Sequence, residues 1–432
     1  MANWAFASCL VLGAIGLCLP RTALASGFVL YDQSAAALAQ GSAVVGSSTE
    51  PAANWFNPAG LAFRQTWGTS ATLALAYADS KFEPEAGPTV KGNLKPQLVP
   101  NAFATLPITS RVHLGFGVFA PYGFAVSWPS DWQGREKAIA VNVTVIAFNT
   151  NLALKLSERW AVALGAAPIY GRVKFAIGLP SEVGSRGDLE GSAWSWQANA
   201  AVMFKALPNK LHLGLTYRGL NQSGRSRLHL SGPADFTATN ATLAETFADQ
   251  NARTTLPLPD MASLGASWWA NPSLKFGLQI DYTRWSVFDR LDIEFDRPTT
   301  PRQIIERRSR DAFSLRAGVQ HSIKNTAWDL RGGLSFDQST GREESLAPSA
   351  PDGNRVGVSL GAGVAIGRVQ LDLGYLLLNF LPAKATGGLE GPQGTYTTRA
   401  HILAITVTGA AIKSAPTDDK VDAELLGEEE HD

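Results

Sequence analysis

Apolar and polar residues alternate with a period of two along most of the chain. One run interleaves Leu211, Leu213, Leu215 and Tyr217 with His212, Gly214, Thr216 and Arg218. The same alternation returns at 313–320, 328–337 and 369–375. A period of two predicts β-strands with one apolar and one polar face. A soluble sheet would turn the apolar face inward and a membrane barrel would turn it outward, so the alternation alone leaves both folds open.

Turn-forming Gly, Pro, Asn and Ser residues divide this pattern into fourteen predicted strands. Their approximate ranges are 67–79, 97–108, 111–126, 136–156, 159–177, 189–206, 209–230, 255–270, 272–296, 308–324, 326–338, 354–367, 368–381 and 395–412. Short turns follow the even segments, whereas long polar loops such as 231–254 and 339–353 follow the odd ones. This asymmetry is typical of a bacterial outer-membrane barrel. We therefore predict an all-β fold, a transmembrane antiparallel β-barrel of about 14 strands within residues 67–413.

Composition excludes two other classes of protein. No stretch of 18 uncharged apolar residues follows residue 25, although 45% of the 432 residues are hydrophobic, and this excludes a helical membrane protein. The 37 basic residues equal the 37 acidic ones, so the chain lacks the basic excess that a nucleic-acid partner requires.

Tryptophan placement also favours a membrane barrel, because indole rings prefer the two membrane interfaces. One ring at the short-turn ends of the strands is expected to contain Trp67, Trp160, Trp268 and Trp328, and a second ring, toward the long loops, Trp194, Trp196 and Trp285. The alternative, that these are ordinary core tryptophans, predicts no sorting by strand end.

The two ends of the chain indicate export. Residues 1–25 have the form of a signal peptide, with an apolar core at 10–19 that is too short for a membrane anchor and small residues before Ser26. Both cysteines lie in this segment, so the mature chain forms no disulfide. Residues 414–432 carry eight acidic residues and predict a disordered periplasmic tail. We predict a bacterial outer-membrane location with both termini periplasmic.

A barrel of this size encloses a lumen that strand residues alone do not fill. Residues 26–66 precede the first strand and contain an Ala-rich stretch at 34–40 and a small-residue stretch at 41–48. We predict that they form a hatch inside the lumen. The Asn57-Pro58 step within them has a simpler interpretation, since Asn-Pro commonly initiates a turn.

Several sequence blocks resemble one known family. They are Ser26-Gly27-Phe28 with the small-residue run to Gly46, Asn57-Pro58-Ala59-Gly60-Leu61, Val99-Pro100-Asn101, the run from Leu114 to Gly123, and Trp132-Gln133-Gly134-Arg135. In order and spacing they are similar to the hatch and first strands of the FadL/TodX family, outer-membrane transporters of long-chain fatty acids and other hydrophobic compounds. The resemblance covers nearly all of residues 26–412, with its specific motifs in the first 135.

This resemblance implies a transport mechanism without an aqueous pore. An amphiphile would land on the extracellular loops, pass to a lumenal pocket and leave sideways through a gap in the wall. By motif, Gly27 and Phe28 correspond to the moving end that opens the pocket. Asn57, Pro58 and Ala59 correspond to the hatch motif.

The sideways gap would come from an inward kink of the third strand, which the resemblance places at Phe119, Pro121 and Gly123. Pro121 cannot donate to a ladder and Gly123 weakens one, so a strand with both should lose pairing locally. The alternative is that Pro121 only ends the strand at its loop.

The extracellular capture site departs from the family pattern. The loop at 178–188 is short for a family that builds an external groove there. In the longer loop at 231–254, Leu243, Phe247 and Asn251 are spaced by four and would line one face of a short helix. We name Leu243 and Phe247 as the candidate capture residues.

A carboxylate head group would need a lumenal cation. Strand phase points four cations inward, together with acidic residues: Arg218, Lys275, Arg316 and Arg331, with Asp281, Asp329 and Asp337. The favoured interpretation is that these inward-facing charges pair with one another inside the barrel, so none is assigned to a head group.

The sequence thus predicts passive uptake of hydrophobic compounds, with long-chain fatty acids favoured over aromatic hydrocarbons or alkanes. A general diffusion porin is the other alternative. The six histidines form no pair with a nucleophile motif and no metal-ligand cluster, so we expect no catalytic residue, metal or cofactor. The expected partners are the hydrophobic solute, lipopolysaccharide and outer-membrane lipid, and the expected state is a monomer.

Overall fold

The structure is a computed structural model that describes residues 27–180, 183–219, 226–387 and 391–409. The predicted signal peptide (1–25) and acidic tail (414–432) lie outside the described residues.

The strands expose their apolar faces. Leu215, Leu315 and Leu334 are 51%, 54% and 59% exposed, and similar residues encircle the molecule. The alternate positions are buried and polar, as at Ser267 and Gln279. A continuous exposed apolar belt around a polar interior is the arrangement of a barrel in lipid, not of a soluble sheet.

The barrel is built from long strands with small helical pieces at the N-terminus. The helical elements are α2 (Ala35–Leu38), α3 (Ala53–Phe56), η1 (Pro58–Phe63), α4 (Ala241–Thr246), η3 (Trp285–Val287) and η4 (Glu343–Ser345). The strands are β1 (Gly68–Pro84), β2 (Val90–Lys91), β3 (Gln97–Pro107), β4 (Val112–Ser127), β5 (Ala140–Lys155), β6 (Trp160–Gly178), β7 (Arg186–Leu207), β8 (Leu211–Gly219), β9 (Arg227–Thr237), β10 (Gln250–Pro257), β11 (Met261–Asn271), β12 (Leu274–Thr283), β13 (Arg290–Phe295), β14 (Gln303–Glu306), β15 (Ala312–Ser322), β16 (Trp328–Asp337), β17 (Arg355–Ile366), β18 (Val369–Phe380), β19 (Ala383–Ala385) and β20 (Gly394–Gly409).

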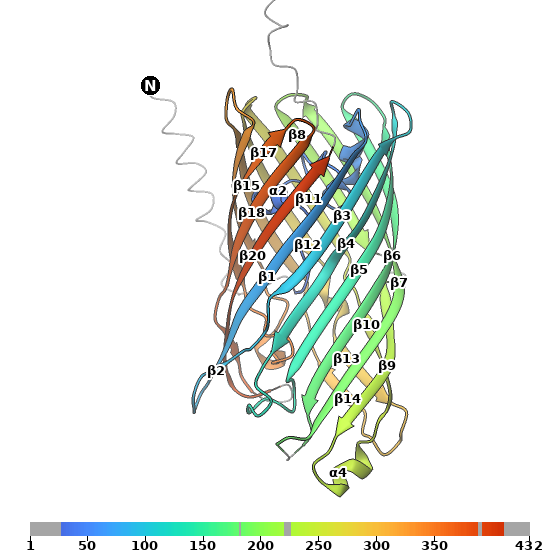
Figure 1. The fold of residues 1–432 in the computed structure, drawn as a ribbon, viewed down its shortest axis with the longest axis vertical. Helices are drawn as coiled ribbons and strands as arrows, with labels where there is room; N and C mark the ends of the chain where they lie inside the picture. Colours follow the sequence, from blue (N-terminus) through green and yellow to red (C-terminus); the bar gives the residue numbers. More distant parts are fainter. Residues whose placement is uncertain (1–26, 181–182, 220–225, 388–390, 410–432) are drawn as a thin grey trace, which may run out of the picture.

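These elements form fourteen wall strands. Four of the wall strands are each divided in two, as β8 with β9, β10 with β11, β12 with β13 and β14 with β15. Neighbours pair antiparallel, and β1 closes the barrel on β20 from Thr69↔Gly409 to Pro84↔Gly394 (Figure 1). The predicted fourteen-stranded antiparallel barrel is confirmed.

The two ends of the barrel differ. Short turns lie at the end that holds α2 and η1, whereas α4 and the long connections lie at the opposite end (Figure 1). In outer-membrane barrels the short turns are periplasmic and the long loops extracellular. The end with α4 is therefore the extracellular end.

Six of the seven tryptophans named from the sequence face outward, and the prediction is wrong for the seventh. Six are 44–62% exposed: Trp67, Trp160, Trp194, Trp196, Trp268 and Trp328. Trp285 is fully buried because the single turn of η3 leaves the wall and carries its side chain into the lumen.

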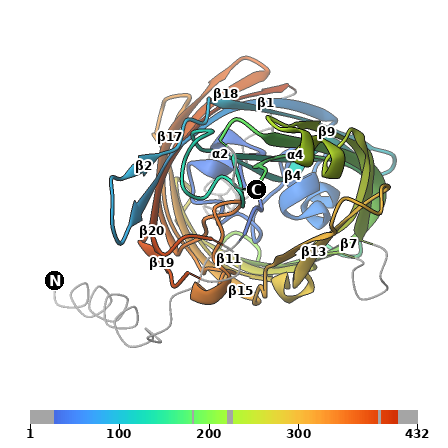
Figure 2. The same ribbon diagram turned by 90° about the horizontal axis from the view of Figure 1, so that it is seen from below.

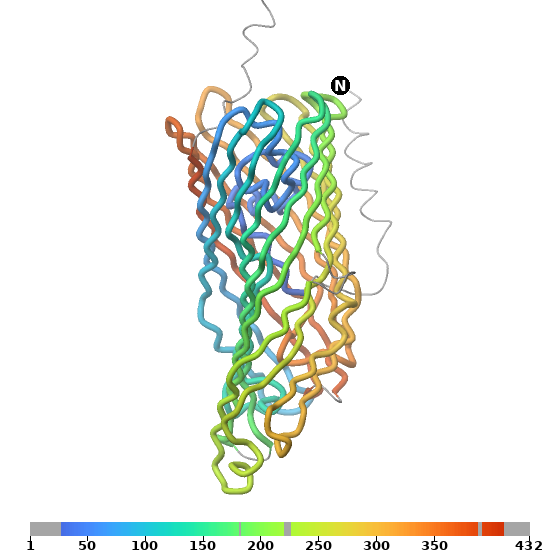
Figure 3. Tube along the Cα trace, turned by 90° about the vertical axis from the view of Figure 1, so that its right-hand side faces the viewer, coloured from blue at the N-terminus to red at the C-terminus, as the bar shows by residue number. Residues whose placement is uncertain are grey.

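Residues 27–66, here called the N-terminal segment, lie inside the periplasmic half of the barrel (Figures 2 and 3). Its backbone N–H groups donate to side chains of three wall strands. Ala35 bonds Thr406 Oγ1 at 2.8 Å, Gly41 bonds Ser359 Oγ at 3.0 Å and Val45 bonds Gln279 Oε1 at 3.1 Å. The polar lumenal face of the wall therefore satisfies the orphaned backbone groups of a segment with little secondary structure.

A buried charge network also joins the wall to this segment. Arg316, 4% exposed, bonds Asp281 at 2.6 Å and Asp337 at 2.9 Å. Its guanidinium lies 3.8 Å from the ring centroid of Tyr31. Removing the cation would take the direct ion pair from two buried carboxylates, which is far more costly than losing an exposed pair.

We expect Arg316→Met to lower the free energy of unfolding by about 3–5 kcal/mol. Urea unfolding of the protein refolded in detergent measures this loss. Arg172→Met removes an exposed ion pair with Glu190 and should change it by no more than about 1 kcal/mol. Equal effects of the two substitutions would contradict the role given to Arg316.

Candidate functional site

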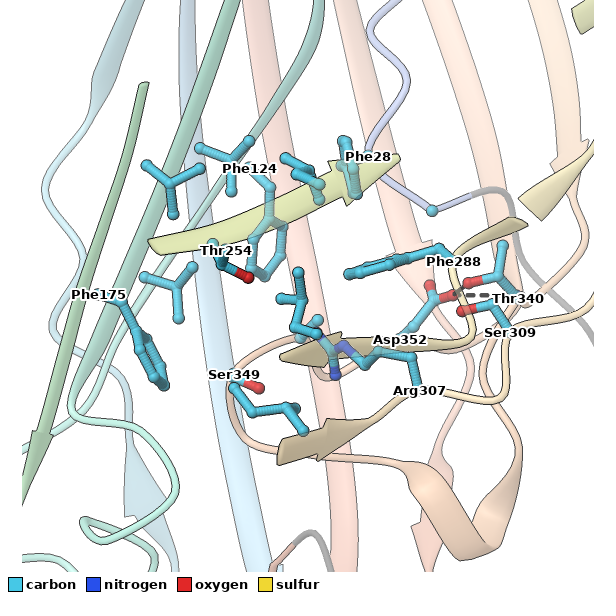
Figure 4. Close-up of a pocket in the computed structure, with 18 of the residues that line it drawn as sticks. Phe28, Phe124, Phe175, Thr254, Phe288, Arg307, Ser309, Thr340, Ser349 and Asp352 are labelled. Carbon is cyan, nitrogen blue, oxygen red and sulfur yellow. Dashed lines mark hydrogen bonds between the residues drawn. The ribbon is translucent and has the colours of Figure 1, made fainter. Parts of the chain in front are cut away.

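A cavity of about 170 Å³ lies in the lumen between the N-terminal segment and the extracellular loops. Most of its lining is apolar and comes from opposite sides of the wall, including Phe28, Phe124, Val143, Phe175, Leu256 and Phe288. Figure 4 shows Phe175 on one side of the cavity and Arg307, Ser309, Thr340 and Asp352 on the other. The cavity therefore has an apolar body and a polar end.

Three arginines, Arg253, Arg307 and Arg355, contribute to the lining. Arg355 donates to the backbone oxygen of Gly27 at 3.0 Å, and its Nε lies 3.9 Å from Asp337. The guanidinium of Arg307 lies 5.6 Å from the ring of Phe288. The nearby carboxylate of Asp352 accepts from the N–H and hydroxyl of Thr340, at 3.0 and 2.9 Å. The arrangement suits an elongated amphiphile with an anionic head.

The predicted moving end, Gly27 and Phe28, lines this cavity. The Phe28 ring packs against Trp285, Tyr122 and Phe288, with centroids 4.5, 6.0 and 6.3 Å away. Gly27 has φ +55°, and a Cβ there would come within 2.4 Å of the Trp285 ring. Only glycine fits this position.

The predicted kink residues mark a break in the third wall strand. Pairing of β3 with β4 stops at Ala102↔Val118, and the β4–β5 register shifts between Phe119 and Tyr122. β4 nevertheless continues to Ser127, so Pro121 interrupts the ladder without ending the strand.

The N-terminal segment takes the place of β3 beside the break. Leu30 N donates to Pro121 O at 3.0 Å, and Gly123 N donates to Phe28 O at 3.0 Å. Val29 forms an isolated bridge with Tyr122. The predicted moving end and the kink are thus one hydrogen-bonded unit, although about 90 residues separate them in sequence.

Asn57 of the predicted hatch motif caps the short helix η1 and anchors the N-terminal segment to the wall. Asn57 accepts at Oδ1 from Ala59 N and donates from Nδ2 to the backbone oxygens of Val45 and Val202. Pro58 starts η1, where its missing N–H costs nothing. The turn interpretation is correct, and the same asparagine also fixes the segment to β7.

The predicted capture helix is only partly present. α4 ends at Thr246, so Phe247 caps it and Asn251 lies in β10, paired with Pro233. The predicted face of three residues on one helix is therefore wrong, because strand pairing extends further into this loop than the periodicity indicated. Leu243 is half-buried, Phe247 packs on Phe236 at 5.5 Å, and neither lines the lumenal cavity.

The inward cations named from sequence lie away from the cavity, whose lining includes none of them. Arg316 and Arg331 are paired with buried carboxylates, and Arg218 packs on Trp55, its guanidinium carbon 4.5 Å from the ring centroid. The sequence missed Arg307 and Arg355. In β17, Val356 and Val358 face outward, so the strand alternation already indicated that Arg355 points inward. Arg307 gave no such signal, because it precedes the predicted strand at 308–324.

Among the residues that the structure describes, no three His, Cys, Asp or Glu side chains gather as metal ligands. The described features are a closed barrel with an exposed apolar belt, an occupied lumen and a cavity with an apolar body and three arginines. They define an outer-membrane transport protein for hydrophobic compounds.

The chain belongs to the OMPP1/FadL/TodX family of outer membrane transport proteins, whose model matches residues 16–410. It is thus a transporter and not an enzyme, and it resides in the outer membrane. The long-chain fatty acid transport protein of Shigella flexneri is 23% identical over 420 residues, covering 88% of this chain and 93% of that protein.

Solved structures share the fold. A Pseudomonas aeruginosa FadL homologue superposes with a TM-score of 0.77 at 19% identity, covering 89% of this chain and all of that one. The Pseudomonas putida toluene transporter TodX superposes with a TM-score of 0.70 at 15% identity, covering 88% of this chain and 98% of that one.

One buried acid in the N-terminal segment has a pH-dependent cost. Asp32 is 1% exposed, and its carboxylate oxygens have no hydrogen-bond partner among the described residues. Burial raises the pKa of this carboxyl to about 7. Because its pKa in the unfolded chain is about 4, this carboxyl holds its proton more tightly in the folded protein. Its contribution to the free energy of unfolding is therefore full at acid pH and is lost as the pH rises toward 7.

We expect the melting temperature in detergent to fall between pH 5 and pH 8, and Asp32→Asn to remove most of that fall. Asp235→Asn, at an exposed position of β9, is the control and should keep the wild-type profile. A profile unchanged by Asp32→Asn would contradict this assignment.

Proposed function

We propose that this protein mediates passive uptake of long-chain fatty acids across the outer membrane. The observation that carries the proposal is the pairing of a largely apolar cavity with Arg307 and Arg355. An acyl chain gains about 0.8 kcal/mol per buried CH₂, and a carboxylate gains charge-assisted hydrogen bonds from a guanidinium. The relatives named long-chain fatty acid transport proteins support the same substrate class.

The solute leaves sideways through the interval between β3 and β4. Leu98 and Val118, which flank it, are 64% and 45% exposed, so the interval lies within the lipid belt. Unpaired backbone there would be costly in hydrocarbon, and the bonds from residues 28–30 satisfy it on the lumenal side. A solute that slips into lipid never returns its CH₂ groups to water.

Gly27 and Phe28 gate this route. Withdrawal of Phe28 from Trp285 and Tyr122 opens the cavity toward the kink at Phe119, Pro121 and Gly123. The bonds of Asn57 to Val45 and Val202 keep the rest of the hatch, with Pro58 and Ala59, in place.

The remaining organisation follows from this role. Residues 1–25 act as the signal peptide, 26–66 as the hatch and 67–413 as the barrel, and 414–432 form a periplasmic tail. A single closed barrel contains the whole route, so the protein works as a monomer surrounded by lipopolysaccharide and outer-membrane lipid.

Arg307→Met tests the substrate class. In a transporter-null strain carrying this protein, we expect the substitution to weaken labelled palmitate uptake about 10- to 100-fold, the range of a lost charged hydrogen bond. Toluene uptake should not change, since it has no head group. Arg302→Met, on the exposed rim, is the control.

If the wild-type protein takes up toluene but not palmitate, the fatty-acid assignment is contradicted and an aromatic channel is favoured. Rapid sugar influx into liposomes that is unchanged by deleting residues 26–60 would favour a porin instead.

A reversible lock tests the gate. Val29→Cys/Tyr122→Cys joins the moving end to the kink, and the mature chain is expected to contain no other cysteine. We expect palmitate uptake to fall about tenfold when the pair is oxidised, as for other lost positioning steps, and to recover on reduction. Val118→Cys/Phe148→Cys joins register partners on the lipid face as the control. Full uptake by the oxidised Val29/Tyr122 variant would contradict a moving end.

A further inference from the structure

Aromatic packing closes the extracellular mouth of the barrel. Trp128 stacks on Trp132 at 4.9 Å, and Phe82 lies 4.7 Å from Tyr396. Trp128 Nε1 donates to Pro348 O at 3.0 Å, which ties together two extracellular connections. All four rings are buried, and Figure 2 shows loops folded across this end. These side chains and loops therefore cover part of the axial path to the lumenal cavity.

The wall itself has an interruption near this end. β10 and β13 share only the register pairs Ala252↔Phe295 and Arg253↔Glu294. Pairing of the same wall strands resumes where Arg284 N donates to Asp260 O at 2.9 Å. Between these points no ladder pair joins the two strands in the described part of the chain. We call this interval, bounded by residues 254–259 and 285–293, the side window.

The cause of the side window is local. Residues 284–289 leave the wall, and η3 turns Trp285 and Phe288 into the lumen, where both are buried. The chain therefore cannot continue the ladder beside 254–257. On its other edge β10 stays paired with β9 along its whole length, so the interruption is confined to one side of the strand.

Cavities lie on both sides of the side window. An outer cavity of about 780 Å³ and the lumenal cavity share Leu230, Arg253 and Thr254 in their linings. The other residues sort by strand face. Leu256, Leu291 and Ile293 line only the lumenal cavity, whereas Thr255, Arg290 and Asp292 line only the outer one. A single layer of chain separates the two spaces, and this layer lacks β10–β13 ladder pairs over residues 254–259 and 285–293.

The side window opens outside the hydrocarbon. Tyr217 and Phe313, 40% and 47% exposed, end the apolar faces of β8 and β15, and β10 and β13 lie beyond them. The outer edge carries the exposed charges of Arg253, Arg290 and Glu294. Water can satisfy unpaired backbone groups at this level, which hydrocarbon cannot do. An interruption at this level therefore costs less than one in hydrocarbon.

An aromatic track leads to the side window from the capture residues. Phe247, beside α4, lies 5.5 Å from Phe236, and Phe236 lies 5.8 Å from Phe295. Phe295 pairs with Ala252, one residue pair beyond the edge of the side window, and it lies on the same lumenal face as Leu291 and Ile293. The track joins Phe247 to the lumenal edge of the opening.

We propose that the side window is the entrance through which the anionic amphiphile passes from the outer surface into the lumenal cavity. This rests on the proposed function. The acyl chain enters first, past Leu256, Leu291 and Ile293, because these apolar side chains line the inner edge. Its carboxylate follows past the charged outer edge toward Arg307.

A reducible bridge across the side window tests this entrance. Thr255→Cys/Asp292→Cys places thiols on its two outer edges, and a bis-methanethiosulfonate reagent joins them across the interruption. Thr255→Cys/His229→Cys, treated identically, is the control, because these residues are register partners across the intact β9–β10 ladder. We expect the first bridge to slow palmitate uptake about tenfold, with recovery on reduction, and the control bridge to have no effect.

Binding to the purified protein separates a closed entrance from a damaged site. With the bridge in place, the palmitate association rate should fall about tenfold while the equilibrium affinity stays the same. A full association rate, or an affinity that falls with the rate, would overturn the entrance and leave fatty-acid uptake intact. No palmitate uptake by the unmodified protein would overturn the proposed function and the entrance with it.

Discussion

The wall of a membrane barrel must satisfy its backbone hydrogen bonds within the protein, because hydrocarbon offers no partner. This constraint distinguishes the two places where the ladder stops. Beside Pro121 and Gly123, within the lipid belt, residues 28–30 supply the missing partners from the lumenal side. Beside Thr254 to Pro257, beyond the belt, water can do so. The bonded break within the lipid belt and the unpaired interval above it follow from the same requirement.

The constraint also makes the N-terminal segment part of the wall. Its N–H groups bond Thr406, Ser359 and Gln279, and Arg316 holds Tyr31 against a pair of buried carboxylates. A segment with almost no regular structure is thereby held at many points. Its first residues are held mainly by the kinked strand and by aromatic contacts of Phe28.

Much of the fold was predictable because strand signals are local. Period-two alternation and turn residues located all fourteen wall strands, and Pro121 with Gly123 indicated where one ladder would fail. Trp285 and Asn251 were misplaced because each lies where an inward turn or an extended hairpin overrides the expected ending of a strand. Arg307 was missed for a related reason, since a short strand, β14, precedes it within a segment interpreted as loop.

The sequence by itself determined the wall, its orientation and the family, because these depend on neighbours in the chain and on short motifs. Tertiary structure alone decided which arginines reach the cavity, that Phe28 and Gly123 share a hydrogen bond, and that pairing between β10 and β13 stops after two residue pairs. Each of these depends on how segments tens to hundreds of residues apart come into register. A one-residue change of register would turn every side chain in a strand to the opposite face, and no local pattern records that pairing.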